Sequence, residues 1–475
     1  MKELYIDTKK KIYRSTAILF VVQLFGALGA GFFFVIQNLF GTYHILGATG
    51  ADQEPILWFI LFWATDFFVV ALVLVLSYLI AGIPAIAPAL SLSVYFCHFS
   101  FESVKGADTY FAYFATPVGY EKTMAIGYMG YFIMAILLSL LIKYLFAGWT
   151  AAKEPIGRGI DKLLKKFKGV PDTLKGITVI EGVDLIVLIL IVPVVSCALT
   201  YILIKYGIEI PFGAAARFLG EQLSALAANN VILAAIIMGL MVGFDLIGPM
   251  SMAAYYVAAV SLLSTGDPRL MTIYSACFIT AGWTAFFSVI WNKVFKKGGK
   301  TDTDDFNITV SGPINAFFEN IKLANAFSMT YAYRSPLTVI PGLMSGSAFA
   351  GLLTALFKIV NTAYIDGSLP KYTTGNYTAG AVDYTYAQLF ERREIYMSFT
   401  LPLRSGDWLS CRIPLLLIIL VSGMVGGLVI MGLKHWQYKF EVKRGLYSEP
   451  DGDMVIEMRN WGKKLLSDVK VKKEG

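Results

Sequence analysis

Long, continuous apolar runs set the pattern of this chain. The windows 15–51 and 413–433 contain no Asp, Glu, Lys or Arg. A hydrocarbon core roughly 30 Å thick is crossed by about 20 apolar residues in a helix. Windows of about that length predict ten membrane-spanning helices, at 16–40, 55–81, 83–99, 124–146, 184–204, 231–247, 250–265, 270–292, 336–358 and 413–433. The runs do not alternate over about 10 residues as barrel strands do, so the sequence predicts an all-α polytopic membrane protein.

The charged residues are few, and their positions predict the topology. Only 15% of the 475 residues are charged, whereas a soluble globular chain carries about 25%. This excludes a disordered chain, a nucleic-acid-binding domain and an ordinary cytosolic enzyme. The formal net charge of +7 comes from basic flanks that the positive-inside rule assigns to the cytoplasm, at 1–14, 143–175, 293–300 and 434–475. Both termini are therefore expected in the cytoplasm, and the first apolar run is expected to remain as a membrane anchor.

The number of apolar stretches exceeds the number of crossings that this topology needs. Two shorter or more broken stretches, 212–228 and 313–333, are expected to be re-entrant or to lie in the interface. Non-helical backbone at membrane depth survives only when it is buried in protein or lines a polar cavity. The surplus therefore points to a solute-binding site.

Two segments outside the spans have amphipathic spacing. Ile160, Leu163, Leu164 and Phe167 follow an i, i+3, i+4, i+7 pattern among lysines, which predicts a helix over 157–169 on the cytoplasmic membrane surface; a solvated loop is the alternative. A weaker pattern over 454–466 is typical of a tail helix that binds either lipid or a soluble partner.

The sequence offers no recognisable catalytic, metal or cofactor site. The three histidines are scattered, and there is no Walker loop, HExxH or G-x-S-x-G motif. We expect no metal, no cofactor and no catalytic residue belonging to the chain itself. The cysteines are expected to be structural and unpaired, at Cys97, Cys197, Cys277 and Cys411.

The most informative segment is 243–255. An ionisable Asp245 at bilayer depth costs roughly 2.5–3.5 kcal/mol, and Gly248-Pro249 directly after it predicts a break in the helix. A broken helix with a carboxylate is a general arrangement for binding a solute near the membrane midplane. We therefore expect a polar cavity here; the alternative is a proline kink in which Asp245 caps a helix.

Three motifs in register resemble one family. Segment 244–254 is similar to the pattern F-D-x-G-G-P-x-N-K-A-A of fructose- and mannitol-type membrane components (enzyme IIC) of the bacterial phosphoenolpyruvate:sugar phosphotransferase system. Segment 81–89 resembles that family's Pro-Gly-rich loop after the second span. Segment 331–341 resembles the end of its T-E-G-A-I-P-F-x-x-x-D-P-L-R-V-I-P segment. Order and spacing hold from about 60 to 435.

Several polar positions depart from the family pattern. Ser251 and Met252 stand where the family has Asn and Lys, and Ile247 replaces its first Gly. Asn325 and Ala326 align with the family's Thr and with the Glu that is expected to engage the sugar and assist phosphoryl transfer. The framework is retained while several sugar contacts are not.

The resemblance implies a homodimeric elevator-type transporter in the bacterial inner membrane. It implies a scaffold domain (1–156), a cytoplasmic connector (157–182), a transport domain (183–433) with an extracellular loop (361–412), and a cytoplasmic tail (434–475). Phosphate would come from separate A and B components. The expected residues lining the sugar or polyol site are Asp245, Gly248, Pro249, Ser251, Asn325, Ser328, Thr330 and Arg334.

Alternatives remain open at this point. Arg334 could bind an anionic group through its guanidinium fork, or it could be structural, pairing with Asp245 or with backbone carbonyls. The missing Glu and Asn-Lys pair favour a secondary permease that does not phosphorylate its substrate. A third possibility is a membrane sensor or assembly subunit that transports nothing.

Overall fold

The computed structural model describes most of the chain as helices. It describes residues 2–40, 67–96, 126–164, 166, 180, 183–246, 248–265, 267–297, 299, 303–317, 321–361 and 407–447. The predicted tail helix 454–466, nearly all of loop 361–412 and Cys97 lie outside these ranges. No strand occurs among the described residues.

Each of the ten predicted spans falls mainly on helix over its described part. The first four correspond to α1 (Lys2–Phe40), α3 (Phe67–Ala81), η2 with α4 (Ile83–Ala85 and Ile86–Phe96), and α8 (Gly127–Leu164). The fifth corresponds to η4 (Val187–Ile191) and α10 (Val192–Ile204). The others correspond to α12 (Val231–Phe244), α13 (Pro249–Thr265), α14 (Arg269–Phe295), α17 (Pro336–Leu356) and α22 (Ile413–Arg444).

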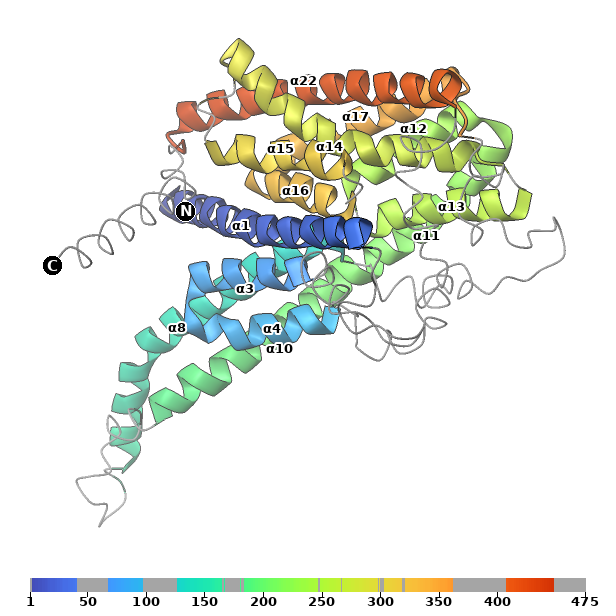
Figure 1. Cartoon of the computed structure of the whole chain (residues 1–475). Helices are drawn as coiled ribbons and strands as arrows, with labels where there is room; N and C mark the ends of the chain where they lie inside the picture. The colour runs from blue at the N-terminus through green and yellow to red at the C-terminus, as the bar shows by residue number, and fades with distance from the viewer. Residues whose placement is uncertain are drawn as a thin grey trace.

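The helices gather into two groups with α1 between them (Figure 1). One group contains α3, α4, α8 and α10, in which α8 packs against α3 and α10. The other contains α12, α14, α17 and α22, which pack against one another. The helices α15 (Thr303–Phe317) and α16 (Ile321–Arg334) belong to the second group, and α16 lies against α1. A face of α16 thus forms the junction between the groups.

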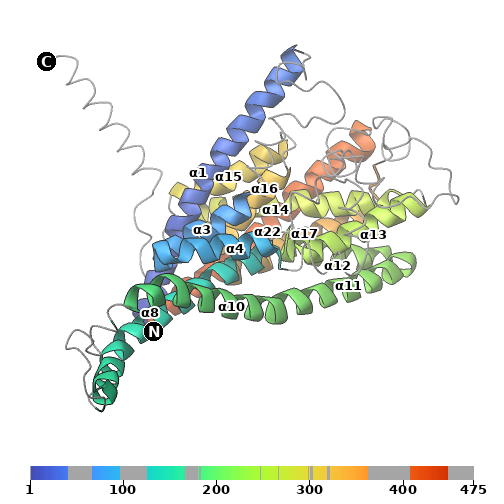
Figure 2. The same ribbon diagram turned by 90° about the horizontal axis from the view of Figure 1, so that it is seen from below.

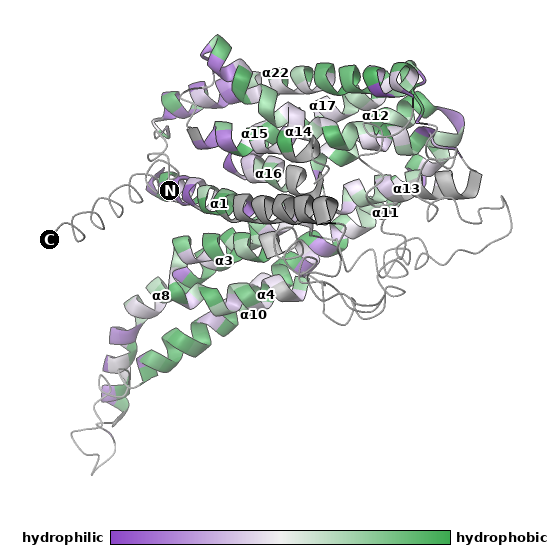
Figure 3. Cartoon of the chain, in the orientation of Figure 1, coloured by the Kyte–Doolittle hydropathy of each residue, from purple (hydrophilic) through white to green (hydrophobic). Residues whose placement is uncertain are grey.

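Five helices in the described part are long and apolar enough to cross a membrane. They are Gly127–Leu163, Val183–Asn229, Arg269–Phe295, Pro336–Leu356 and Trp408–Arg444. The protein is therefore membrane-embedded, although the expected count of about ten spans is met only in part. Hydrophilic residues gather where the start of α1, the start of α15 and the end of α22 lie close together (Figure 3).

The stretch expected to be re-entrant at 212–228 belongs to a much longer helix. A run of 47 residues, Val183–Asn229, passes through α10, the π-turn η5 (Lys205–Glu209) and α11 (Ile210–Asn229). At 1.5 Å per residue it is about 70 Å long, and Figure 2 shows α10 and α11 as one extended rod. The apolar 212–228 segment is thus not a separate short element, because nothing between 205 and 229 stops the helix.

The predicted amphipathic helix over 157–169 is not a separate helix in its described part. Residues 157–164 are the last turns of α8, which runs without interruption through Pro155 to Leu164. Proline inside a helix removes one backbone hydrogen bond, but here the helix continues beyond it. The connector therefore begins as an extension of the fourth predicted span.

Two consecutive helix pairs, α12–α13 and α15–α16, stand out because they contain short helices. Helix α12 has 14 residues and α15 has 15, so each is only about 21–23 Å long and falls short of a hydrocarbon core of roughly 30 Å. Helices α12 and α13 are joined through 245–248. The start of α15 meets the end of α16 through the ion pair between Asp305 and Arg334. The predicted stretch 313–333 is accordingly not one segment but parts of α15 and α16.

Glycines let α12 approach α17 closely. A Cβ added to Gly239 or Gly243 would overlap the backbone of α17, and one added to Gly351 would overlap the carbonyl of Ala235. Small residues permit such backbone contact between membrane helices. This packing fixes the depth at which α12 ends, and with it the position of Asp245.

Candidate functional site

Asp245 lies at a break between two helices. Helix α12 ends at Phe244, and Asp245 has an extended backbone with φ −150° and ψ 86°. The amide of Gly248 donates to the carbonyl of Asp245 at 3.0 Å. Pro249 then begins α13. Proline is tolerated there because the backbone amides of the first helical turn have no acceptor within the helix. The break that Gly248 and Pro249 predict is present.

The carboxylate of Asp245 is enclosed by backbone. Only 4% of the residue is exposed, and the backbone amide of Tyr128 donates to the carboxylate. A Cβ on Gly248 or on Gly127, whose φ is +51°, would overlap it. Oδ1 has no hydrogen-bond partner within the described part of the chain. The sequence predicted an open polar cavity here; the structure instead closes the carboxylate off from solvent and leaves an acceptor unmatched.

One face of α16 contacts α1. The rings of Phe327 and Phe20 lie 5.9 Å apart, and three residues further on the Oγ1 of Thr330 lies 3.3 Å from the Oε1 of Gln23. Residues three apart share a helix face. A predicted site residue, Thr330, therefore faces α1 from the second helix group.

The same face of α16 reaches the surroundings of Asp245 one turn later. The ring of Tyr333 stacks on Phe132 at 4.8 Å, and its hydroxyl donates to the carbonyl of Tyr128 at 3.2 Å. Because the amide of Tyr128 donates to Asp245, the backbone at Tyr128 links α16 to the break between α12 and α13.

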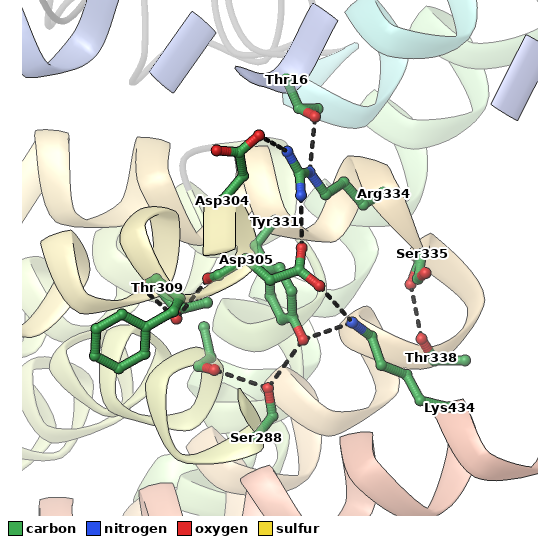
Figure 4. Close-up of polar contacts among 12 residues, drawn as sticks. Thr16, Ser288, Asp304, Asp305, Thr309, Tyr331, Arg334, Ser335, Thr338 and Lys434 are labelled. Carbon is green, nitrogen blue, oxygen red and sulfur yellow. Dashed lines mark hydrogen bonds and ion pairs between the residues drawn. The ribbon is translucent and has the colours of Figure 1, made fainter. Parts of the chain in front are cut away.

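Arg334, the last residue of α16, is held in a buried ion-pair cluster (Figure 4). Its Nη1 lies 2.7 Å from Oδ1 of Asp305, and its Nη2 lies 3.8 Å from Oδ2 of Asp304. Its Nε donates to Oγ1 of Thr16 at 2.8 Å, and the guanidinium lies over the ring of Tyr13 at 4.8 Å. The structure therefore pairs Arg334 with two acids of α15 and not with Asp245, the partner that the sequence suggested.

Lys434 extends the cluster into α22. Its Nζ donates to the hydroxyl of Tyr331 at 2.6 Å and lies 3.9 Å from Oδ2 of Asp305. The hydroxyl of Ser288 donates to the carbonyl of Ala285, so the Tyr331 hydroxyl is the donor in its 3.2 Å contact with Ser288. Arg334 and Lys434 are thus balanced by Asp304 and Asp305.

The remaining predicted site residues do not all converge on Asp245. The hydroxyl of Ser251 forms a hydrogen bond of 3.1 Å with the hydroxyl of Tyr274, so Ser251 faces α14. Ser328 is buried in α16. The side chain of Asn325 lies outside the described residues. The structure brings together Asp245, Gly248 and the α16 face that carries Thr330.

Sequence reasoning missed several polar residues that meet this face. Asp304 and Asp305 follow a basic segment, and Lys434 directly follows an apolar run, so each looked like an ordinary flank. Gln23 is one of three amide side chains in the apolar window 16–40; a polar residue well inside such a window was a signal that could have found it.

The described residues contain no group of three or more His, Cys, Asp or Glu side chains that could hold a metal ion. Cys197, Cys277 and Cys411 are free thiols. The groups around Asp245 offer hydrogen bonding and enclosure.

Curated relatives share low identity with about half of the chain. The "PTS system fructose-specific EIIABC component" of Bacillus subtilis is 24% identical over 261 residues, 54% of this chain and 36% of the relative. The "Fructose permease IIC component" of Bacillus amyloliquefaciens is 25% identical over 264 residues, 54% of this chain and 75% of the relative. The "Fructose-like permease IIC component 2" of Escherichia coli is 33% identical over 82 residues, 17% of this chain and 23% of the relative.

No protein-family model matches the chain. No solved structure matches it either. The similarity to the curated relatives shows that the chain, over about half of its length, resembles membrane components of fructose-type phosphotransferase systems.

Proposed function

We propose that this protein is the membrane permease component of a sugar phosphotransferase system, which imports a sugar or polyol. The names of its relatives support this assignment. The observation that carries it is the buried Asp245 carboxylate at the break between α12 and α13, with an oxygen that no described residue engages. Burying an unmatched acceptor costs free energy, and a substrate hydroxyl would supply the missing donor.

The proposed site takes its shape from the helix break. In the proposed lining, Gly248 and Pro249 place backbone beside Asp245, and α16 contributes Thr330 and Ser328. Ser251 and Asn325 complete the proposed lining. Because Arg334 already binds Asp304 and Asp305, we assign it to positioning the α15–α16 pair rather than to direct contact with substrate.

The proposed architecture has a scaffold over 1–156 and a transport domain over 183–433. The short pairs α12–α13 and α15–α16 would be the re-entrant segments of the transport domain, since each includes helices below spanning length. The transport domain would move past the scaffold as an elevator does, in a homodimer with both termini in the cytoplasm. Clustering of polar residues at the start of α1 and the end of α22 supports placing both on one side (Figure 3).

Transport is tested by uptake into cells that lack their own fructose permease. We expect Asp245→Asn to reach the membrane in normal amounts while uptake falls at least about 10-fold, the factor for one hydrogen bond worth about 1.4 kcal/mol. The matched control is Asp267→Asn, because Asp267 pairs with exposed Arg269 between α13 and α14. Uptake that Asp245→Asn leaves unchanged would reject this site.

Coupling to phosphorylation is tested by the chemical state of the accumulated sugar. With separate A and B components present, we expect sugar phosphate inside the cell, and omitting either component should abolish accumulation. Position 326 is a buried Ala where the family's Glu aligns, so this chain would leave phosphate transfer to the other components. Accumulation of unmodified sugar without them would contradict the coupling.

A further inference from the structure

Gln23 is a buried amide in the middle of α1. The residue is fully shielded from solvent, its Oε1 lies 3.3 Å from the hydroxyl of Thr330, and its Nε2 has no hydrogen-bond partner in the part of the chain that the structure describes. A buried amide donor without an acceptor is unfavourable. Such a group is retained at a cost unless something binds to it.

The hydroxyl of Thr330 cannot satisfy the whole amide. Its single hydrogen is donated to the carbonyl of Ala326 at 2.7 Å, so the longer contact with Gln23 is the weaker one. If the amide is turned over, Nε2 donates to Thr330 and Oε1 becomes the unmatched atom. In both orientations one end of the Gln23 amide is available for a ligand.

Gln23 contacts α16 directly, and Asp245 is linked to α16 through the backbone of Tyr128. Gln23 meets Thr330, and the hydroxyl of Tyr333, one turn further along, reaches Tyr128. The backbone amide of Tyr128 in turn donates to Asp245, whose Oδ1 is likewise buried and has no hydrogen-bond partner among the described residues. The Gln23 amide on α1 and the Asp245 carboxylate at the break after α12 are therefore linked through one turn of α16.

This combination favours a particular class of ligand. Each hydroxyl of a polyol donates one hydrogen and accepts others, so different hydroxyls of one polyol would suit the amide and the carboxylate. An apolar solute would leave both unmatched. An anion would be repelled by an ionised Asp245.

We propose that Gln23 is a further solute-binding residue, through which α1 hydrogen-bonds a hydroxyl of the sugar or polyol. The inference rests on the proposed function and extends its site to the N-terminal helices. It also gives a reason for a buried amide near the middle of α1.

The test is Gln23→Leu, which keeps the volume and removes the polar atoms. If the amide serves a ligand, the unliganded variant keeps or raises its thermal midpoint, because an unmatched buried group has been removed. Its dissociation constant for D-fructose, D-mannitol or D-glucitol, whichever the purified wild type binds, should rise about 10-fold. Ser15→Ala is the control, since Ser15 is equally buried on α1 but bonds the Ile12 carbonyl of its own helix.

Monodeoxy analogues of the bound sugar separate a ligand contact from a structural effect. For the analogue that lacks the hydroxyl reached by Gln23, wild type and Gln23→Leu should bind equally, whereas the 10-fold difference should persist for the others. Two results together would assign Gln23 a structural role and overturn the proposal. They are a lower thermal midpoint of unliganded Gln23→Leu, and a difference in dissociation constant from wild type that persists for every analogue.

The remaining outcomes distinguish the two proposals. Wild type that binds sugar and Gln23→Leu that binds it equally well would overturn only the role of Gln23. Wild type that binds none of the three probes would overturn the proposed function and the role of Gln23 together.

Discussion

Arg334 shows at the residue scale how a buried charge becomes structural. Its side chain is 1% exposed and that of Asp305 is 7% exposed. Removing one partner of a buried pair leaves an uncompensated charge, which typically costs about 3–5 kcal/mol. We predict that Arg334→Met lowers the free energy of unfolding in detergent by about that amount, as measured by chemical denaturation.

An exposed arginine of the chain provides the control, and a double variant measures the coupling between Arg334 and Asp305. Arg158→Met removes an exposed arginine of α8 and should change little. In the double variant Arg334→Met/Asp305→Asn, the two losses should not add, because the second substitution removes the acid that the first left unpaired. Additive losses would show that the two residues do not act as a pair.

Gly248 is a residue whose lack of a side chain has a specific reason. A Cβ there would overlap the Asp245 carboxylate, so Gly248→Ala must displace either the acid or the turn. Overpacking of this kind costs about 1–3 kcal/mol. We predict a lower thermal midpoint together with loss of sugar uptake. Gly148→Ala in α8, where an added Cβ has open space, should leave both unchanged; a fully active Gly248→Ala would contradict the enclosed geometry.

At the scale of elements, the start of α22 depends on an acidic cap. Asp407 precedes the π-turn η8 (Trp408–Arg412), and its carboxylate accepts from the amides of Ser410 and Leu409 at 2.8 and 3.1 Å. The hydrogen bond from the Ser410 amide, above all, lowers the pKa of Asp407 below its usual range. A cap of this kind favours helix formation at that point.

The lowered pKa of Asp407 fixes the direction of a pH effect. Because the pKa is lower in the folded state, the stabilisation is present above the unfolded value of about 3.9 and is lost as the pH falls through the folded value. We predict that Asp407→Ala lowers the thermal midpoint at pH 7, and that the gap from wild type closes as the pH drops below about 4. A gap that is independent of pH would show that the carboxylate charge contributes nothing.

Helix positions could be read from the sequence because apolar length is a local property. The windows 270–292 and 336–358 fall on α14 and α17 nearly residue for residue. Continuity between helices was harder to predict: 212–228 joins α10 through a π-turn, and 157–164 continues α8 beyond Pro155. The proline and glycine residues near those joints do not stop the helix. The apolar pattern alone does not distinguish a helix that continues through such residues from one that ends there.

At the scale of the whole molecule, the account requires that α1 and α16 separate during transport. The rings of Phe20 and Phe327 lie in contact across that junction. We predict that cysteines at these two positions, in a background without native cysteines, block uptake when joined by a short bis-methanethiosulfonate reagent, which forms a disulfide with each thiol. Reduction of these disulfides should restore uptake. Full uptake in the joined protein would show that the two helices stay together.

The site was predictable only in part because its residues meet through tertiary packing. Asp245 could be predicted as a site residue because an acid in an apolar window, followed directly by the helix breakers Gly248 and Pro249, can be recognised in the sequence itself. The pairing of Arg334 with Asp304 and Asp305, and of Thr330 with Gln23, joins residues from three different helices. Nothing in the local pattern specifies such pairs, because they depend on how α15 and α16 fold back on each other and against α1.

The most direct measurement of the central claim is equilibrium binding of sugars to the purified protein, with Asp245→Asn beside wild type. We predict that wild type gains thermal stability with at least one of D-fructose, D-mannitol and D-glucitol. Asp245→Asn should keep its unliganded midpoint and lose most of that gain. An identical, ligand-dependent gain in both proteins would contradict the claim that Asp245 forms part of the solute site.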